Sequence, residues 1–222
     1  MNKTTIIGLW MLAVILLNAF FIMNAPQHIT GAVTARLFVI STQSFNDHKI
    51  FVESWNLISL PAIPNNSTVD GALNLYPNYT SIHTYAQLDT TDEWKAYNPN
   101  ISASAVQDLN NISEKKGYWI NMKNKSQFTL SGTMEAVTQI QVYQGWNLVG
   151  YPINVTKTIT SAFTSINGSY AAIYAYYAND TTDPWKVYNP SIAPQFSDLT
   201  AAYPFYGYWV NATSNATITI TT

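Results

Sequence analysis

The chain contains one sequence unit twice, and this duplication constrains the fold more than any other feature. Three blocks recur: Trp55–Pro61 with Trp146–Pro152, Tyr79–Pro99 with Tyr170–Pro190, and Gly117–Asn121 with Gly207–Asn211. The second block has 12 identities in 21 positions, where chance would give about one or two. We therefore expect two tandem domains, over residues 46–134 and 137–222, each just long enough to build a core without disulfides.

Each unit is predicted to be mainly β with short helices, as a small β-sandwich or barrel-like domain. The segments 55–60 and 146–151 are apolar on both alternating faces, which is typical of a buried central strand. Apolar residues at helical spacing predict one short helix near 68–75 and another near 159–166. Further strands are expected at matching places in the two units: 79–88, 93–97 and 127–131, and 170–178, 184–188 and 216–221.

An apolar segment precedes the two units. Residues 6–25 form a run of 20 mostly apolar residues behind Lys3, and a helix of that length spans about 30 Å, enough to cross the hydrocarbon core of a membrane. Residues 1–26 are therefore either a cleaved signal peptide or a membrane anchor helix, since their length favours an anchor and their small terminal residues favour cleavage. Both alternatives export the rest of the chain. Residues 27–45 are interpreted as a linker with an extra strand at 33–41.

Each unit combines three motifs: (Gly/Ser)-Trp-Asn-Leu-(Ile/Val)-x-x-Pro, Trp-Lys-x-Tyr-Asn-Pro and Gly-Tyr-Trp-(Ile/Val)-Asn. This combination resembles a β-rich tandem repeat of archaeal and bacterial secreted, cell-surface and S-layer-like proteins. Residues 29–35 also resemble the beginning of exported archaeal surface proteins. The resemblance implies a location at the cell surface and a non-catalytic role, and it implies no defined ligand.

Asn-x-Ser/Thr sequons are unusually frequent in the two units. Eleven occur after residue 50, whereas composition alone would give about three to four. Because N-glycans are attached only to exported, accessible segments, this excess favours a glycoprotein. Asn66 adjoins Asn65 and the two are not expected to carry glycans together. The glycosylation candidates are Asn65, Asn78, Asn100, Asn111, Asn124, Asn154, Asn167, Asn179, Asn211 and Asn215.

Composition excludes several classes of function. Charged residues make up 10% of the chain, the net charge is −2, and Arg36 is the only arginine, so the chain has no electrostatic footprint for nucleic acid. It has no cysteine, which excludes disulfides, thiolate metal sites and a cysteine nucleophile. No nucleophile–base constellation is present, so we expect no catalytic residues, no cofactor and no metal. The repeated Asp89 and Asp92 are interpreted as turn residues.

The recurring aromatic residues allow two interpretations. A core built from large rings would suit a small domain without disulfides, and we favour this interpretation because a core has to recur in both units. The alternative is a sugar-stacking surface. Strand alternation places Trp209 on the face of Asn211 and places Trp119 on the face of Asn121, opposite Tyr118 and Ile120. Trp119 and Trp209 are therefore the candidate sugar-stacking residues.

These observations together predict a non-catalytic, exported cell-envelope glycoprotein module with a structural or adhesive role. Its expected partners are the membrane, through residues 6–25, and other envelope proteins or polysaccharide. A carbohydrate-binding module that uses exposed Trp and Tyr is the first alternative. A polysaccharide-acting enzyme that uses the repeated aspartates is the second alternative.

Overall fold

The computed structural model describes residues 42–101 and 107–222, and within them the chain folds mainly as antiparallel β-sheets with short helices. This confirms the prediction of a mainly β chain with short helices. The apolar segment 6–25 and the expected strand at 33–41 lie outside the described residues. Among the helices that are described, none is long and apolar enough to cross a membrane.

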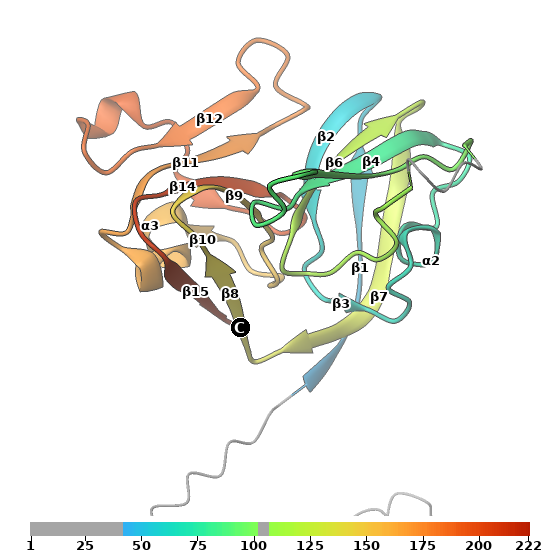
Figure 1. Cartoon of the computed structure of the whole chain (residues 1–222), viewed down its shortest axis with the longest axis horizontal. Helices are drawn as coiled ribbons and strands as arrows, with labels where there is room; N and C mark the ends of the chain where they lie inside the picture. The colour runs from blue at the N-terminus through green and yellow to red at the C-terminus, as the bar shows by residue number, and fades with distance from the viewer. Residues whose placement is uncertain (1–41, 102–106) are drawn as a thin grey trace, which may run out of the picture. The chain divides into compact units, whose positions relative to one another are not determined.

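The first half of the described chain contains two antiparallel sheets (Figure 1). The order β2-β6-β4-β5 makes the first sheet, with bounds Ser54–Ser59, Gly117–Met122, Tyr79–Tyr85 and Trp94–Tyr97. The order β1-β7-β3 makes the second sheet, with bounds Thr42–Phe51, Ser126–Glu135 and Ile63–Pro64. β1 pairs with β7 over its full length, from Thr42 opposite Glu135 to Phe51 opposite Ser126.

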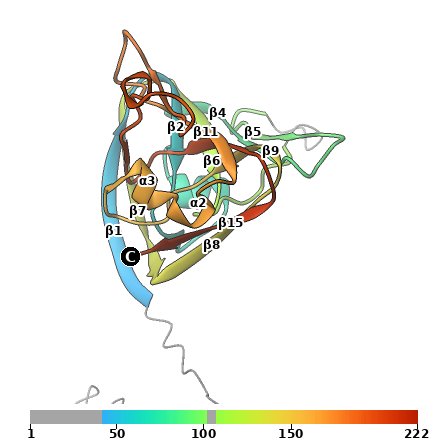
Figure 2. The same cartoon turned by 90° about the vertical axis from the view of Figure 1, so that its left-hand side faces the viewer.

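Ala136 alone lies between β7 and the first strand of the second half, Val137–Val142, which runs beside the last strand of the chain, Ala216–Thr221 (Figure 2). The second half contains an equivalent four-stranded sheet. The order β9-β14-β11-β12 makes this sheet, with bounds Gly145–Val149, Tyr208–Ala212, Tyr170–Tyr176 and Trp185–Tyr188. Two strand pairs complete this half: β8 (Val137–Val142) with β15 (Ala216–Thr221), and β10 (Lys157–Thr158) with β13 (Ala201–Ala202).

Short helices cross from one sheet to the other in both halves. α2 (Val69–Leu73) and α3 (Ile159–Ala162) begin at equivalent threonines, Thr68 and Thr158. Each threonine hydroxyl accepts a hydrogen bond from a backbone N–H three residues further on, as an N-cap does. The other helices of the described residues are the 3-10 helices η2 (Thr164–Ile166) and η3 (Pro194–Phe196).

Strand alternation divides each four-stranded sheet into an inner and an outer face. In β6, Tyr118, Ile120 and Met122 are buried, while Trp119 and Asn121 between them are partly exposed. The inner residues form one hydrophobic cluster in each half, around Phe51, Tyr79 and Phe128 in the first and around Tyr151, Phe163 and Tyr208 in the second. No tryptophan of the described chain belongs to either cluster. The expectation that recurring large rings build the core therefore holds for Tyr118 and Tyr208. It is wrong for the tryptophans, because alternation turns them outward.

The motif Trp-Asn-Leu does not lie in a central strand. β2 and β9 end their sheets, so the prediction of a central strand is also wrong. Both strands are nevertheless apolar on two faces. Leu57 and Leu148 lie on the outer face of their sheets and are buried, because the other half covers this part of the strand. Ile58 forms a β-bridge with Tyr206, and Val149 forms the equivalent bridge with Lys116.

The asparagine of this motif closes the turn that leads into the strand. Asn56 Oδ1 accepts from Val52 N at 3.1 Å, and its Nδ2 donates to Val52 O and Ser54 O at 2.8 and 3.0 Å. Asn147 makes the same three bonds with Tyr143 and Gly145. Both side chains are buried, and a buried amide has to be hydrogen-bonded in this way.

The motif Gly-Tyr-Trp combines a close approach of two backbones with an anchored tyrosine. A Cβ on Gly207 would lie 2.7 Å from Ile58 O and 3.2 Å from Gly117 Cα, so a side chain at this position would push the halves apart. Tyr118 and Tyr208 are buried, and their hydroxyls accept from the backbone N–H of Ser113 and Tyr203 at 2.8 and 2.7 Å. Both motifs thus recur for reasons of backbone geometry.

Candidate ligand-binding face

Every tryptophan of the described chain lies on the outer face of a four-stranded sheet. Trp55, Trp94, Trp146 and Trp185 are between 39% and 45% exposed, while Trp119 and Trp209 are partly buried beneath their neighbours. The register of the strands places Trp119 opposite His83 and Trp209 opposite Tyr174. The sequence-predicted residues Trp119 and Trp209 thus lie at the middle of an aromatic surface.

This surface is assembled from both halves in a reciprocal way. Tyr85 and Trp94 of the first half pack on Trp209 of the second, with ring centroids 5.3 and 5.9 Å apart. Their equivalents Tyr176 and Trp185 pack on Trp119 of the first half, at 5.1 and 5.7 Å. The tips of the β4–β5 and β11–β12 hairpins therefore each reach the sheet of the opposite half.

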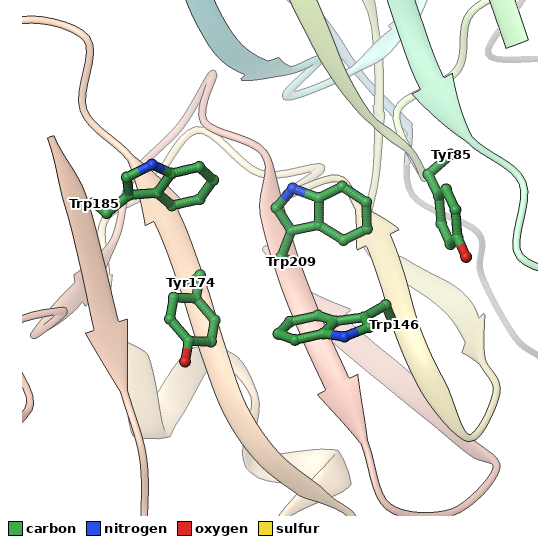
Figure 3. A pocket seen from close by; sticks show the side chains of 5 residues that line it. All are labelled: Tyr85, Trp146, Tyr174, Trp185 and Trp209. Carbon is green, nitrogen blue, oxygen red and sulfur yellow. The ribbon is translucent and has the colours of Figure 1, made fainter. Parts of the chain in front are cut away.

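The aromatic surface is hollowed into a cleft of about 510 Å³ (Figure 3). Its five lining residues are all aromatic: Tyr85, Trp146, Tyr174, Trp185 and Trp209. Figure 3 shows one ring on each strand of the sheet, in the order Trp185 on β12, Tyr174 on β11, Trp209 on β14 and Trp146 on β9. The size lies within the range of small-ligand sites, which extends from about 300 to 1,000 Å³.

Most polar atoms of the cleft are free within the described residues; the exception is the hydroxyl of Tyr85, which lies beside Glu93. No hydrogen bond inside residues 42–101 and 107–222 engages the indole N–H of the three tryptophans or the hydroxyl of Tyr174. The lining also contains no charged side chain. The cleft therefore offers flat apolar rings with hydrogen-bonding groups at their edges, and it carries no formal charge of its own.

The first half presents the equivalent set of side chains: Trp55, His83, Trp94 and Trp119, with Tyr176 of the second half. Trp55 packs against His83 and Trp119, with ring centroids 5.7 and 6.4 Å apart. The one chemical difference is His83 in place of Tyr174. Burial lowers the pKa of His83, while Asp108 opposes that shift, and its Nε2 lies 3.0 Å from Ser81 Oγ.

The repeated aspartates form two salt-bridge clusters instead of a catalytic pair. Lys95 Nζ lies 2.7 Å from Asp89, 3.2 Å from Asp92 and 3.2 Å from Asp108. Lys186 contacts the equivalent Asp180, Asp183 and Asp198 at 3.0, 2.9 and 3.5 Å. Within the described residues, no group of three or more His, Cys, Asp or Glu is arranged to hold a metal ion.

Asp89 and Asp180 also shape the turns, as their sequence context predicts. Asp89 Oδ1 accepts from the backbone N–H of Thr91 and Asp92 at 3.2 and 3.1 Å. Asp180 accepts the equivalent bonds from Thr182 and Asp183. The hydrogen bonds from Lys95 and Thr91 hold the pKa of Asp89 well below its usual range, so this carboxylate is a poor candidate for a general acid.

The sequon asparagines lie at the surface. Asn78 and Asn211 are half-buried and the other eight glycosylation candidates, from Asn65 to Asn215, are exposed. The side chain of Asn66, which is also exposed, accepts bonds from the backbone and hydroxyl of Thr68 at the start of α2.

Sequence reasoning did not find most of the cleft. It named Trp119 and Trp209 but not Trp146, Tyr174 or Trp185, although alternation in β9, β11 and β12 could have placed each of these on the outer face. Tyr85 carries no such signal, because its role depends on how the two halves pack.

Comparison with models of protein families, with curated proteins and with solved structures gave no match to the chain.

Proposed function

We propose that the chain is an exported, non-catalytic cell-surface module that adheres to carbohydrate through the aromatic surface of its two four-stranded sheets. The observation that carries this proposal is the cleft of about 510 Å³ lined by Tyr85, Trp146, Tyr174, Trp185 and Trp209. Six tryptophans lie outside both hydrophobic cores and form an apolar patch on the surface. A patch of this kind is typical of an interaction site.

The chemistry of the cleft favours a sugar over other ligands. A pyranose ring has an apolar face of C–H groups and a rim of hydroxyls, so it matches a flat ring with a polar edge. The indole N–H groups are free donors within the described residues, and a sugar hydroxyl can accept from each of them. The absence of charge in the lining favours a neutral polysaccharide.

Two features of the sequence support the exported location. The apolar residues 6–25 are long enough to insert into a membrane, and the sequons occur on side chains that are exposed or half-exposed. The salt-bridge clusters support the non-catalytic part, because each repeated aspartate is held by Lys95 or Lys186.

The binding proposal is tested by pull-down of the full chain, in detergent, on insoluble cellulose, chitin, mannan and β-1,3-glucan. We expect retention on at least one of these polymers, and we expect Trp209→Ala and Trp119→Ala to weaken it by about tenfold or more. Phe196→Ala is the matched control, because Phe196 is 66% exposed and does not line the cleft. Lack of binding to every polymer and to the native envelope polysaccharide would overturn the proposal.

The location is tested by the intact mass of the chain isolated from its native cell. We expect a mass that exceeds the polypeptide by several glycans, with or without loss of the first 26 residues. A polypeptide recovered from the cytosol without sugar would contradict this part of the proposal and leave the binding test unaffected.

A further inference from the structure

We infer that the module has two carbohydrate sites, one on each four-stranded sheet, and that it bridges two polysaccharide chains. The inference rests on the proposed function and adds the number of sites and the way in which a polymer meets them. Its basis is the reciprocal packing of the two halves, in which equivalent segments make equivalent contacts.

The backbone contacts between the halves occur in matched pairs. Ser59 N donates to Phe205 O at 3.0 Å, and Gly150 N donates to Lys115 O at the same distance. Ser59 and Gly150 occupy equivalent positions in the two sequence units, and so do Lys115 and Phe205. The segment of the first half that contacts the second half is thus equivalent to the segment of the second half that contacts the first. Such reciprocal contacts relate the two halves by an approximate two-fold axis.

The same axis divides the aromatic residues into two sets that share no member. The cleft uses Tyr85, Trp146, Tyr174, Trp185 and Trp209. The equivalent set consists of Tyr176, Trp55, His83, Trp94 and Trp119. Each set takes four rings from one half and one tyrosine from the other, so each site requires the complete two-unit chain.

A two-fold axis restricts how a polysaccharide can bind. A polysaccharide has a reducing and a non-reducing end, and rotation by a half-turn exchanges these ends. One straight chain that crossed the axis would therefore meet the two sets in opposite directions and could fit only one of them well. Two chains that run in opposite directions can each fit their own set, which makes the module a cross-link.

Charge complementarity favours neutral glycans at both sets. All ten side chains are aromatic, and His83 is the only titratable base among them, with a pKa lowered by burial. Because His83 stands where the other set has Tyr174, the two sites differ in their chemistry. We therefore expect two classes of site in the wild type, and a single class in His83→Tyr.

The experiment uses the full chain in detergent with hexasaccharides of β-1,4-linked glucose, N-acetylglucosamine and mannose, and soluble polymers of the same linkages. Calorimetry is expected to give two hexasaccharides per chain, and the matching polymer is expected to produce strong light scattering when mixed with the protein. Trp55→Ala and Trp146→Ala are the matched variants, because these equivalent side chains are 39% and 43% exposed and pack within their own halves.

Each single variant is expected to bind one hexasaccharide and to lose the scattering with polymer. One hexasaccharide per wild-type chain, with all binding lost in either variant, would overturn the inference and show one continuous site. The stoichiometry of the wild type decides this point even if a variant fails to fold, which circular dichroism would reveal. Absence of binding to every probe is a different result and would contradict the proposed function itself.

Discussion

At the scale of single residues, the recurring motifs encode turns. Ser54 and Gly145 occupy the same position before the Trp-Asn-Leu motif, and both have positive φ, at 77° and 100°. Glycine adopts this region freely, whereas serine does so at a cost. The buried Asn56 and Asn147 hold both turns with the same hydrogen bonds. One turn is therefore relaxed and its counterpart is strained.

The difference between these two turns predicts how substitutions at Ser54 and Gly145 change the free energy of unfolding. Ser54→Gly should stabilise the protein, and Gly145→Ser should destabilise it, each by about 1 kcal/mol. Urea unfolding followed by circular dichroism measures both changes. A destabilised Ser54→Gly variant would show that the serine side chain has a role beyond the turn.

The salt-bridge clusters predict how stability changes in acid. Hydrogen bonds from Lys95, and from Thr91 and Asp92, lower the pKa of Asp89. Hydrogen bonds from Asp183, Lys186 and Thr182 lower that of Asp180. The unfolded chain, with aspartate pKa values of about 3.9, then binds more protons than the folded chain, so stability is lost as pH falls below about 4.

We expect the variant Lys95→Met with Lys186→Met to have a shallower loss of thermal midpoint below pH 4. Its midpoint at pH 7 should be only slightly lower, because these groups are solvent-screened. Lys125→Met is the control, since Lys125 forms no ion pair within the described residues. Midpoint curves of the double variant and the wild type that remain parallel down to pH 2 would contradict the prediction.

At the scale of elements, local signals in the sequence predict most of the structure. The short helices, the Asp-Thr-Thr-Asp turns and the closing strands occur near their expected places, because caps, turn residues and alternation act over a few residues. The edge position of β2 and β9 could not be predicted in this way. The edge position depends on which strand of one half contacts the other half. The apolar residues of these strands predict that the strands are buried, but they do not predict which element covers them.

The side chains at the tips of the two hairpins reach the opposite half. Tyr85 at the end of β4 packs on Trp209 of the opposite half. A double-mutant cycle with Tyr85→Ala and Trp209→Ala should give a coupling of about 0.5–1.5 kcal/mol in unfolding free energy. The cycle of Tyr85→Ala with Trp55→Ala is the control and should give no coupling above about 0.5 kcal/mol, since these two rings share no contact. Additive effects in the first cycle would mean that the hairpin does not stabilise the opposite sheet.

At the scale of the whole described chain, sequence duplication predicts two similar units but not how they fit together. Identical residues in the two units say nothing about which of them touch across the boundary. The clearest departure from equivalence is Phe205, which occupies the position of Lys115. Phe205 belongs to the hydrophobic cluster of the first half and packs against Phe45 and Phe128, with ring centroids 6.3 and 6.0 Å apart.

The second half thus supplies a core residue to the first, which predicts cooperative unfolding. The wild type should unfold in a single calorimetric transition whose van't Hoff and calorimetric enthalpies agree. Phe205→Ala should lower the free energy of unfolding by about 3–5 kcal/mol, since it leaves a cavity inside the cluster. It should also separate an early transition of the first half from a later one of the second.

The matched control is Phe163→Ala, which removes a ring of similar burial from the second cluster. Because Phe163 contacts Tyr208 within its own half, its loss should lower the second half first. Two transitions already present in the wild type would show that each half unfolds independently of the other, in spite of the shared phenylalanine.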